Sequence, residues 1–267
     1  MRGDFNAINA DGDRYLPDVA AFRPPFRLSV AAPAYNEAEG IGHVIESWRR
    51  YLAASVEVEK FEIIVCNDGS RDATGNILDQ LARLHSEVRP IHFTRNQGAA
   101  AALTTAIAAT TQDWVLLTDS DGQFPIENLE PMWAAMRHQG APAAIGIRQK
   151  KDRFFARFGT SASGVLCNWL HRSSIRDFNS AFKLVWGPLL RALNLEAKGM
   201  NYSTEVTSRL LECGVTIAEV EIEHRPRTTG SSSMRLLHAA AHRLLFVSYV
   251  GMRQLLFGVG VLRRPLS

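Results

Sequence analysis

The sequence of 267 residues predicts an α/β fold with a doubly wound, mostly parallel sheet. Short apolar runs alternate with longer segments of helical spacing, which is typical of a parallel sheet covered by helices. Acidic, polar or aromatic residues follow several of these runs, where such sheets bind their ligands. No run reaches the roughly 18 apolar residues that a membrane-spanning helix needs. The pattern favours a globular protein with one substantial core.

Each expected element is identified by its length and its apolar pattern. In chain order, the strands are expected at residues 28–32, 62–66, 89–93, 114–118 and 143–147. The helices are expected at residues 37–54, 72–85, 99–110 and 126–137. The turn Asn67-Asp68-Gly69-Ser70 follows the second strand, and either Ser70 or Asp72 can cap the helix after it.

Charge divides the chain into three parts. Residues 1–26 are polar and end in a proline-rich sequence, which predicts a flexible arm before a domain at 27–233. From residue 224 onward there are seven arginines and no acid, so residues 234–267 are expected to form a basic, amphipathic helical tail. In a helical projection Arg253 lies with the other basic residues, opposite Met252 and Leu255. We expect the arginines to contact lipid headgroups; packing on the sheet or on a second subunit is the alternative.

Composition excludes several classes of protein. The chain is 46% hydrophobic and 21% charged, with a net charge of +3, as in globular proteins. Its three cysteines are far apart, which argues against a disulfide framework or a cysteine metal site. The glycine fingerprint of dinucleotide-binding proteins and the P-loop are both absent, and so are aromatic-spaced nucleic-acid motifs. The start of the sequence does not resemble a secretory signal, so we expect a cytoplasmic protein associated peripherally with the membrane.

Two carboxylates one residue apart, Asp119 and Asp121, follow the apolar run 114–118. Residues i and i+2 of a strand share a face, so the two acids would repel each other unless a cation lay between them. Hard divalent cations prefer oxygen ligands and leave positions open for phosphate oxygens. The pair therefore predicts a Mg²⁺ or Mn²⁺ site for a diphosphate; a solvated acidic turn is the alternative.

Two further strand ends carry comparable residues. The sequence Pro33-Ala34-Tyr35-Asn36-Glu37 follows the first run, and Asp68 follows the second. Turn chemistry accounts for Gly69 and Ser70, but it does not account for an acid at the matching end of another strand. We therefore expect residues from three strand ends to form one crevice.

In their order and spacing, three motifs resemble the family-2 glycosyltransferases, namely Pro33-x-Tyr35-Asn36-Glu37, Asn67-Asp68-Gly69-Ser70-x-Asp72 and Asp119-Ser120-Asp121-x-Gln123-x-Pro125. The Gln and the Pro after the acids are closest to the polyprenyl-phosphate branch, which includes dolichyl-phosphate mannose synthase. The resemblance covers about residues 27–235. It implies a GT-A (Rossmann-like) fold, a GDP- or UDP-sugar donor and inversion at the anomeric carbon.

The resemblance also implies roles for single residues. Tyr35 would lie against the base, Asp68 would accept a hydrogen bond from its ring N–H, and Arg227 would reach the diphosphate. Asp119, Asp121 and Gln123 would surround the metal. The implied donor site consists of Pro33, Tyr35, Glu37, Asp68, Arg95, Asp119, Ser120, Asp121, Gln123 and Arg227.

An acceptor-phosphate site is implied by Arg148, Arg157 and Ser161, together with Ser180 in the motif Asp177-x-x-Ser180-x-Phe182. Arginine forks and hydroxyls suit a phosphate monoester, whereas a solvated basic helix is the alternative. Glu205 and Arg209 match a family motif and are expected either to shape the site or to form an exposed ion pair. The sequence departs from the branch at Ser233, where a lysine is usual, and at Glu221, where a proline is usual.

The expected catalytic residues are Asp121, Asp177 and Arg227. A polyprenyl-phosphate acceptor is already anionic and needs no strong general base, whereas a hydroxyl acceptor needs one, for which Asp177 is the candidate. A non-catalytic nucleotide-sugar-binding module is the third hypothesis, and a homo-oligomer is possible under each of them. The sequence leaves open the sugar and the choice between uracil and guanine.

Overall fold

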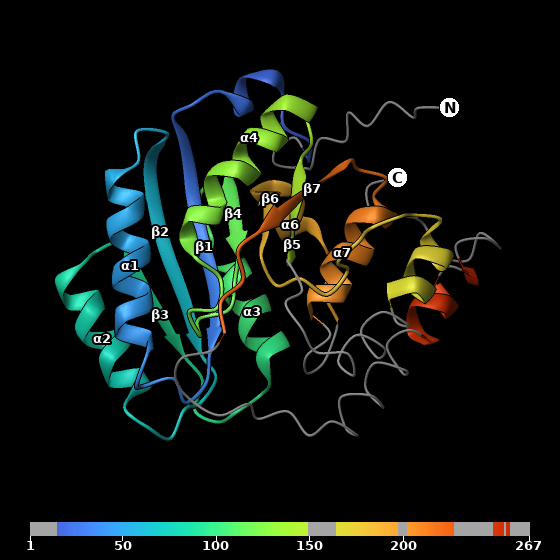
Figure 1. The fold of residues 1–267 in the computed structure, drawn as a ribbon. Helices are drawn as coiled ribbons and strands as arrows, with labels where there is room; N and C mark the ends of the chain where they lie inside the picture. The colour runs from blue at the N-terminus through green and yellow to red at the C-terminus, as the bar shows by residue number, and fades with distance from the viewer. Residues whose placement is uncertain (1–14, 149–163, 197–201, 227–247, 254, 257–267) are drawn as a thin grey trace.

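A computed structural model describes residues 15–148, 164–196, 202–226, 248–253 and 255–256. Figure 1 shows a central sheet with helices on both faces. The seven strands are arranged in the order β3-β2-β1-β4-β6-β5-β7, and β6 alone among them runs antiparallel to its neighbours. Their bounds are Phe26–Ala34 (β1), Val58–Asn67 (β2), Val88–His92 (β3), Trp114–Leu117 (β4), Ala143–Arg148 (β5), Lys183–Trp186 (β6) and Ile217–Ile222 (β7).

The helices divide between the two faces of the sheet. They include α1 (Ile41–Ala54), α2 (Thr74–Leu84), α3 (Ala99–Ala108), α4 (Leu129–Gln139), α6 (Gly187–Ala192) and α7 (Tyr202–Glu212), with short 3-10 helices η1 (Val19–Phe22) and η2 (Ile126–Asn128). Residues 164–171 and 248–253 are also helical. Side chains of α1, α2 and α4 pack on one face, and those of α3, α6 and α7 on the other.

Alternation along the strands produces these two cores. Leu28 and Val30 of β1 belong to the core under α1 and α4, whereas Ala31 belongs to the core under α3. The strands Ile63–Cys66 and Trp114–Leu117 alternate in the same way, and all of these positions are fully or almost fully buried. A strand buried on both faces reads as a continuous apolar run, which is why these strands could be predicted.

The mixed α/β fold with a mostly parallel sheet is confirmed, and the first five strands match their expected positions. Two strands, β6 and β7, were not predicted. The first helix begins at Ile41 rather than at residue 37, because the amides of Gly40 and Ile41 both donate to the Glu37 carbonyl in a turn. No helix within the described ranges is long and apolar enough to cross a bilayer.

The end of the expected N-terminal arm is ordered against the domain, so the prediction of a flexible segment as far as residue 26 is wrong there. The Trp114 indole donates to the Ala21 carbonyl at 3.1 Å, and the ring centroids of Phe22 and Trp114 are 5.4 Å apart. Phe26 is already part of β1 and lies 4.0 Å from the ring of Trp133. Burial of these aromatic rings outweighs the proline signal that marked the segment as an arm.

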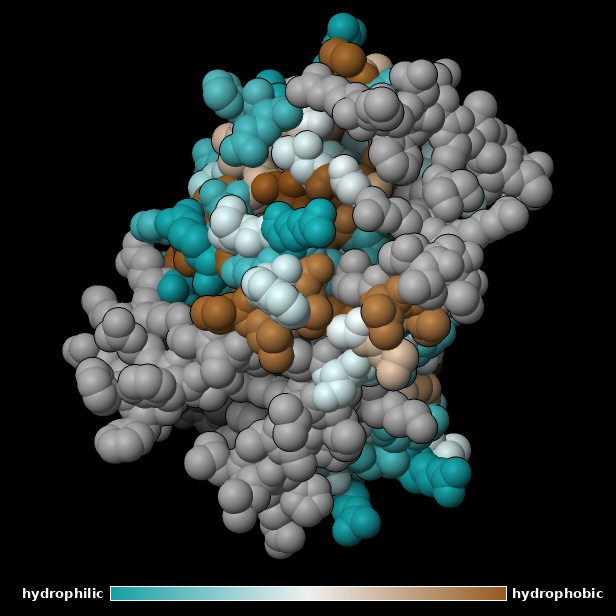
Figure 2. Space-filling model, turned by 90° about the vertical axis from the view of Figure 1, so that its right-hand side faces the viewer, coloured by the Kyte–Doolittle hydropathy of each residue, from teal (hydrophilic) through white to brown (hydrophobic). Residues whose placement is uncertain are grey.

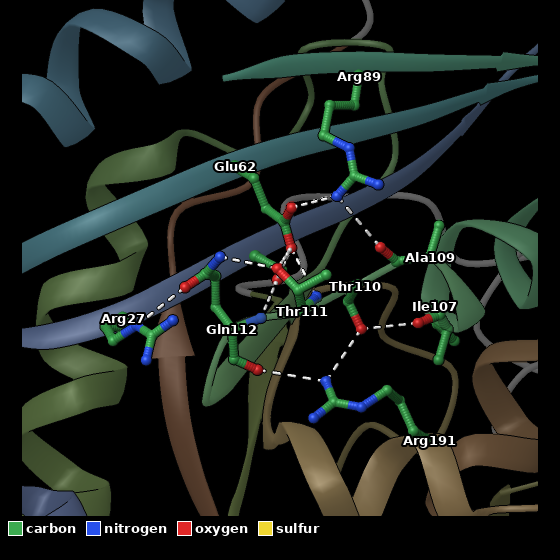
Figure 3. Close-up of polar contacts among 10 residues, drawn as sticks. Arg27, Glu62, Arg89, Ile107, Ala109, Thr110, Thr111, Gln112 and Arg191 are labelled. Atoms are coloured by element: carbon green, nitrogen blue, oxygen red, sulfur yellow. Dashed lines mark hydrogen bonds and ion pairs between the residues drawn. The ribbon is translucent and has the colours of Figure 1, made fainter. Parts of the chain in front are cut away.

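A buried carboxylate near the amino-terminal ends of β3 and β4 holds the connection between α3 and β4 (Figure 3). Glu62 is 6% exposed and accepts hydrogen bonds from the Ser29 hydroxyl at 2.7 Å and from the Thr111 amide at 2.6 Å. It also pairs with Arg89. Burial raises the pKa of Glu62, but these donors outweigh burial and hold the pKa below its usual range.

Candidate active site

The carboxyl ends of β2, β1 and β4 are adjacent in the sheet, and hydrogen bonds join the loops that follow them. The Ser120 hydroxyl donates to the Pro33 carbonyl at 2.7 Å, which joins the end of β4 to the end of β1. The Asn36 amide donates to the Ser70 hydroxyl at 2.9 Å, and the Ala38 amide donates to the Asp72 carboxylate at 3.1 Å. The three strand ends therefore form one polar edge. The Ser120 hydroxyl holds this edge together and is buried.

Asp68 organises the loop that follows β3. Its carboxylate accepts hydrogen bonds from the Asn96 side chain at 2.8 Å, the Gln97 amide at 2.6 Å and the Gly98 amide at 2.9 Å. A carboxylate has about four acceptor positions, so most of them are occupied by this loop. Gly69 has a φ of 66°, and a side chain there would lie 2.4 Å from the Arg95 backbone. Only glycine fits this close approach of the two loops.

Asp119 is held from behind by a tyrosine. The Tyr202 hydroxyl at the start of α7 donates to Asp119 Oδ1 at 2.5 Å. Burial and then the nearby Asp121 raise the pKa of Asp119 to about 6, although the Tyr202 hydrogen bond lowers it. Burial and Asp119 likewise raise the pKa of Tyr202 well above its usual range. Two neighbouring carboxylates of this kind favour a bound cation.

The segment after β7 is attached to the turn that contains Asp121. The Gln123 amide donates to Asp121 Oδ1 at 3.1 Å, and the Gln123 side chain donates to the Arg225 carbonyl at 3.2 Å. The Arg225 amide returns a hydrogen bond to the Gln123 carbonyl at 2.8 Å. Arg225 therefore lies beside the turn that contains Asp121.

Asp177 and Arg148 form a bidentate ion pair. Arg148 Nε and Nη2 lie 2.8 Å and 2.9 Å from the two carboxylate oxygens of Asp177. Asp177 is 6% exposed; burial raises its pKa, but the Arg148 fork outweighs burial and lowers it. A general base must be free to take a proton near neutral pH, so this pairing opposes the role expected of Asp177. The Arg148 guanidinium was expected to bind the acceptor phosphate, and its pairing with Asp177 opposes that role as well.

Behind this pair lies a buried lysine. Lys183 is 1% exposed, and its ammonium group donates to the Ser203 hydroxyl at 2.8 Å and to the Ser180 carbonyl. Burial lowers the pKa of Lys183 to about 7, while Asp177 and Asp119 raise it. Ser180 is fully buried, which contradicts its expected contact with the acceptor. The serine backbone supports Lys183 instead.

The model of the family described as "Glycosyl transferase family 2" matches residues 29–184, which span β1 to β6 and include all three strand-end loops. The chain belongs to this family. Two curated relatives are similar over most of the chain. Glycosyltransferase AglD of Haloferax volcanii is 29% identical over 216 residues, which are 78% of this chain and 35% of AglD. Polyprenol monophosphomannose synthase of Mycolicibacterium smegmatis is 27% identical over 81% of this chain and 84% of that protein.

A solved structure supports the fold. Glucosyl-3-phosphoglycerate synthase of Mycobacterium tuberculosis, in complex with Mn²⁺ and uridine-diphosphate-glucose, has a TM-score of 0.65 with 20% identity. The match covers 89% of this chain and 80% of the synthase. The GT-A-type fold expected for this family-2 glycosyltransferase is therefore confirmed.

The donor set at the end of β4 fits a divalent metal. Asp119, Asp121 and the side-chain carbonyl of Gln123 are hard oxygen ligands, and burial followed by repulsion from Asp121 raises the pKa of Asp119. Within the described ranges no three His, Cys, Asp or Glu side chains lie close enough together to hold a metal. Mg²⁺ commonly keeps ligand positions for water and phosphate oxygens, which this set of three side chains would leave open.

The predicted residues have different outcomes. Tyr35 and Glu37 lie partly exposed at the same edge, and Arg95 is exposed on the loop that Asp68 holds. Glu205 and Arg209 are 3.3 Å apart and almost fully buried, so they are not an exposed ion pair. Arg157, Ser161, Arg227, Ser233 and most of the tail at 234–267 lie outside the described residues.

Three residues near the site were missed by the sequence prediction: Tyr202, Lys183 and His224. The His224 ring packs edge-on against Phe124 at 4.9 Å, and burial followed by Arg148 lowers the pKa of His224. Only Lys183 carried a signal, since a lysine inside the apolar run 182–185 predicts a buried charge with a nearby partner. A separate cavity of about 470 Å³, lined by Tyr51, Glu57, Glu130 and Trp133 among others, holds none of the predicted site residues.

Proposed function

We propose that this family-2 glycosyltransferase moves one sugar from a nucleoside-diphosphate sugar to a polyprenyl phosphate, with inversion and with Mg²⁺ or Mn²⁺ bound. The observation that carries the proposal is the pair of acids at the carboxyl end of β4, where burial and Asp121 raise the pKa of Asp119. The side-chain oxygens of Asp119, Asp121 and Gln123 would hold the metal. When bound, the metal supplies positive charge that stabilises the departing diphosphate.

The donor site is formed by the remaining strand ends. Tyr35 would stack on the base, and the loop that Asp68 holds would place Arg95 beside it. This arrangement fixes the anomeric carbon relative to the acids, and such positioning accounts for a large part of the barrier reduction in group transfer. A GDP-sugar and a UDP-sugar remain equal candidates on these contacts.

The transfer step forms one bond and breaks another. A phosphate oxygen of the acceptor attacks the anomeric carbon, and the bond from that carbon to the diphosphate oxygen breaks on the opposite face. The bonding electrons leave with the nucleoside diphosphate, so the configuration inverts. Arg227 would balance the charge of the departing group, and Arg157 and Ser161 would hold the attacking phosphate.

The choice of an anionic acceptor rests on the ion pair of Asp177 with Arg148. A hydroxyl acceptor needs a base, whereas Asp177 is bound on both oxygens and its pKa is lowered. A phosphate monoester is ionised before it binds and needs no base. The name of the relative from Mycolicibacterium smegmatis, a polyprenol monophosphomannose synthase, supports the same acceptor class. Such an acceptor would place the enzyme at the cytoplasmic face of a membrane.

The test is an acceptor and donor screen with the purified chain and Mn²⁺. Labelled UDP- and GDP-sugars are offered with a short polyprenyl phosphate or with the matching polyprenol. Transfer to the phosphate alone, lost in Asp121→Asn and retained in the control Glu127→Gln, is the expected result. Transfer to the alcohol at an equal rate would overturn the acceptor assignment. Transfer that survives in Asp121→Asn would overturn the metal site.

A further inference from the structure

Exposed apolar side chains gather on two short helices. Eight large apolar residues are exposed in the described part of the chain, and five of them are Val165, Leu166, Trp169, Met252 and Leu255. The other three, Val19, Val56 and Leu84, lie on separate elements of the chain. Trp169 is 74% exposed, which is unusual for a tryptophan. An exposed apolar cluster of this kind marks an interaction surface.

The two helices, at residues 164–171 and 248–253, pack against each other. The Leu170 side chain lies 3.8 Å from the position where a side chain on Gly251 would begin. Cys167 and Val250 are buried between the helices and the domain, so the exposed residues are on the opposite side. Figure 2 views this side of the molecule and shows apolar side chains gathered there. We call Val165, Leu166, Trp169, Met252 and Leu255 the apolar patch.

Polar contacts fix the direction in which the second helix faces. Arg253 lies 3.1 Å from Glu212 of α7, and Arg209 donates to the Tyr249 hydroxyl at 2.9 Å. The arginine expected to contact lipid headgroups therefore packs against the domain, which corrects the sequence-based orientation for Arg253. Met252 and Leu255 are left on the outer side. The orientation of the second helix is thus held by an ion pair and a hydrogen bond to α7.

The two sequence segments that contain the apolar patch are rich in basic residues. Residues 148–176 contain seven Lys and Arg with one Asp, and residues 224–267 contain seven Arg and no acid. The rest of the chain therefore has a net charge of −10. Arg172, directly after the first helix, is exposed. Basic sequence of this kind beside exposed apolar residues is attracted to anionic lipid headgroups.

We propose that the apolar patch is a docking surface for an anionic lipid bilayer, with Trp169 inserted at the headgroup level. Tryptophan favours this interface, because its ring is apolar and its N–H is polar. A second copy of the chain is the poorer occupant, because a two-fold interface would bring the same basic segments together. The docking does not depend on the acceptor, so it stands or falls separately from the proposed function.

Intrinsic fluorescence makes the surface directly testable. Trp48, Trp114 and Trp133 are buried and Trp186 is only partly exposed, so Trp169 is the one highly exposed tryptophan of five. The full chain is mixed with vesicles of phosphatidylcholine, with or without phosphatidylglycerol. We expect binding only with phosphatidylglycerol and weakening by salt. Lipids brominated near the headgroup should quench the wild type and not Trp169→Phe, which still binds.

The decisive variant is Trp169→Asp, which should bind these vesicles about tenfold more weakly. The matched control is Leu84→Asp, which changes an equally exposed apolar residue elsewhere (74% in both) and should bind like the wild type. Unchanged circular dichroism shows that both variants fold. Equal vesicle binding by Trp169→Asp and the wild type would overturn the proposal. So would a dimer that Trp169→Asp dissociates while vesicle binding is unaltered.

A second readout separates this proposal from the catalytic one. With a short, water-soluble polyprenyl phosphate and no vesicles, Trp169→Asp should transfer sugar at the wild-type rate. Absence of transfer by every protein, with vesicle binding intact, would refute the proposed function and leave the docking surface standing.

Discussion

The two ends of the sheet surround a carboxylate in opposite ways. Near the amino-terminal ends of the strands, Glu62 receives hydrogen bonds from Ser29 and Thr111 and an ion pair from Arg89, and its pKa is lowered. At the carboxyl end of β4, Asp119 has one hydroxyl donor and a second acid nearby, and its pKa is raised to about 6. A carboxylate satisfied by its own chain stabilises the fold. A carboxylate left with excess negative charge indicates a place for a cation from outside.

The comparison predicts first that substitutions at the carboxyl end of the sheet reduce activity, whereas substitutions near the amino-terminal end reduce stability. Asp121→Asn should reduce transfer by about 100- to 1000-fold, because on the proposed function it removes charge that would hold the metal beside the leaving group. Its folding stability should be unchanged or higher, since a like-charge contact with Asp119 is removed. Steady-state kinetics and urea unfolding measure the two effects. A variant that unfolds but keeps its activity per folded molecule would place Asp121 with the structural acids.

Glu62→Gln should show the converse behaviour. It removes the charge that pairs with Arg89, and the fold should lose about 2–3 kcal/mol; this is less than for a fully buried pair because Arg89 is 46% exposed. Activity per folded molecule should stay at the wild-type level. Glu59→Gln, at the exposed start of the same strand, is the control and should unfold like the wild type. Loss of activity without loss of stability would contradict the structural role of Glu62.

The dependence of stability on pH should differ in sign between the two acids. The folded pKa of Asp119 is about 6 against an ordinary value of 3.8, so its ionisation destabilises the metal-free fold above pH 6. As the pH falls from 7 towards 4, the wild type should therefore gain about 2 kcal/mol relative to Asp119→Asn. The lowered pKa of Glu62 acts in the other direction: it stabilises the fold above the unfolded pKa, and this is lost as the pH falls through the folded pKa. Urea unfolding in the presence of a chelator at several pH values measures how the free energy of unfolding depends on pH. The same pH dependence in the wild type and in Asp119→Asn would refute the raised pKa of Asp119.

The smallest expected effect is on metal affinity, and it concerns Tyr202, which contacts Asp119. Tyr202→Phe removes the 2.5 Å hydrogen bond that orients Asp119, and we expect Mn²⁺ affinity to fall about tenfold. Stability should change little. Tyr51→Phe, whose ring lines the separate cavity, is the matched control for a lost tyrosine hydroxyl. Calorimetric titration with Mn²⁺ distinguishes them, and equal affinities in the two variants would show that Tyr202 does not act on Asp119.

The sequence predicted the parts of this structure that depend on neighbouring residues. The runs around Val30, Ile64 and Leu116 form strands because both faces are buried, and their ends could be read from local turn chemistry. The strand β6 was missed because it is four residues long and contains Lys183, which reads as exposed until its partners are known. Tyr202 and Asp119 are 83 positions apart, and no local pattern encodes their contact. The pairing of Arg148 with Asp177 was missed for the same reason: each residue suggested its own ligand, and folding joined them.

Manganese binding measured by electron paramagnetic resonance tests the central claim most directly. The wild type should bind one Mn²⁺, and the signal of the bound ion should change when UDP or GDP is added. Glu62→Gln should behave in the same way. Asp121→Asn should lose that bound signal while remaining folded. An unchanged Mn²⁺ signal in Asp121→Asn, with either nucleotide, would contradict the assignment of the carboxyl edge of β4 as the metal and diphosphate site.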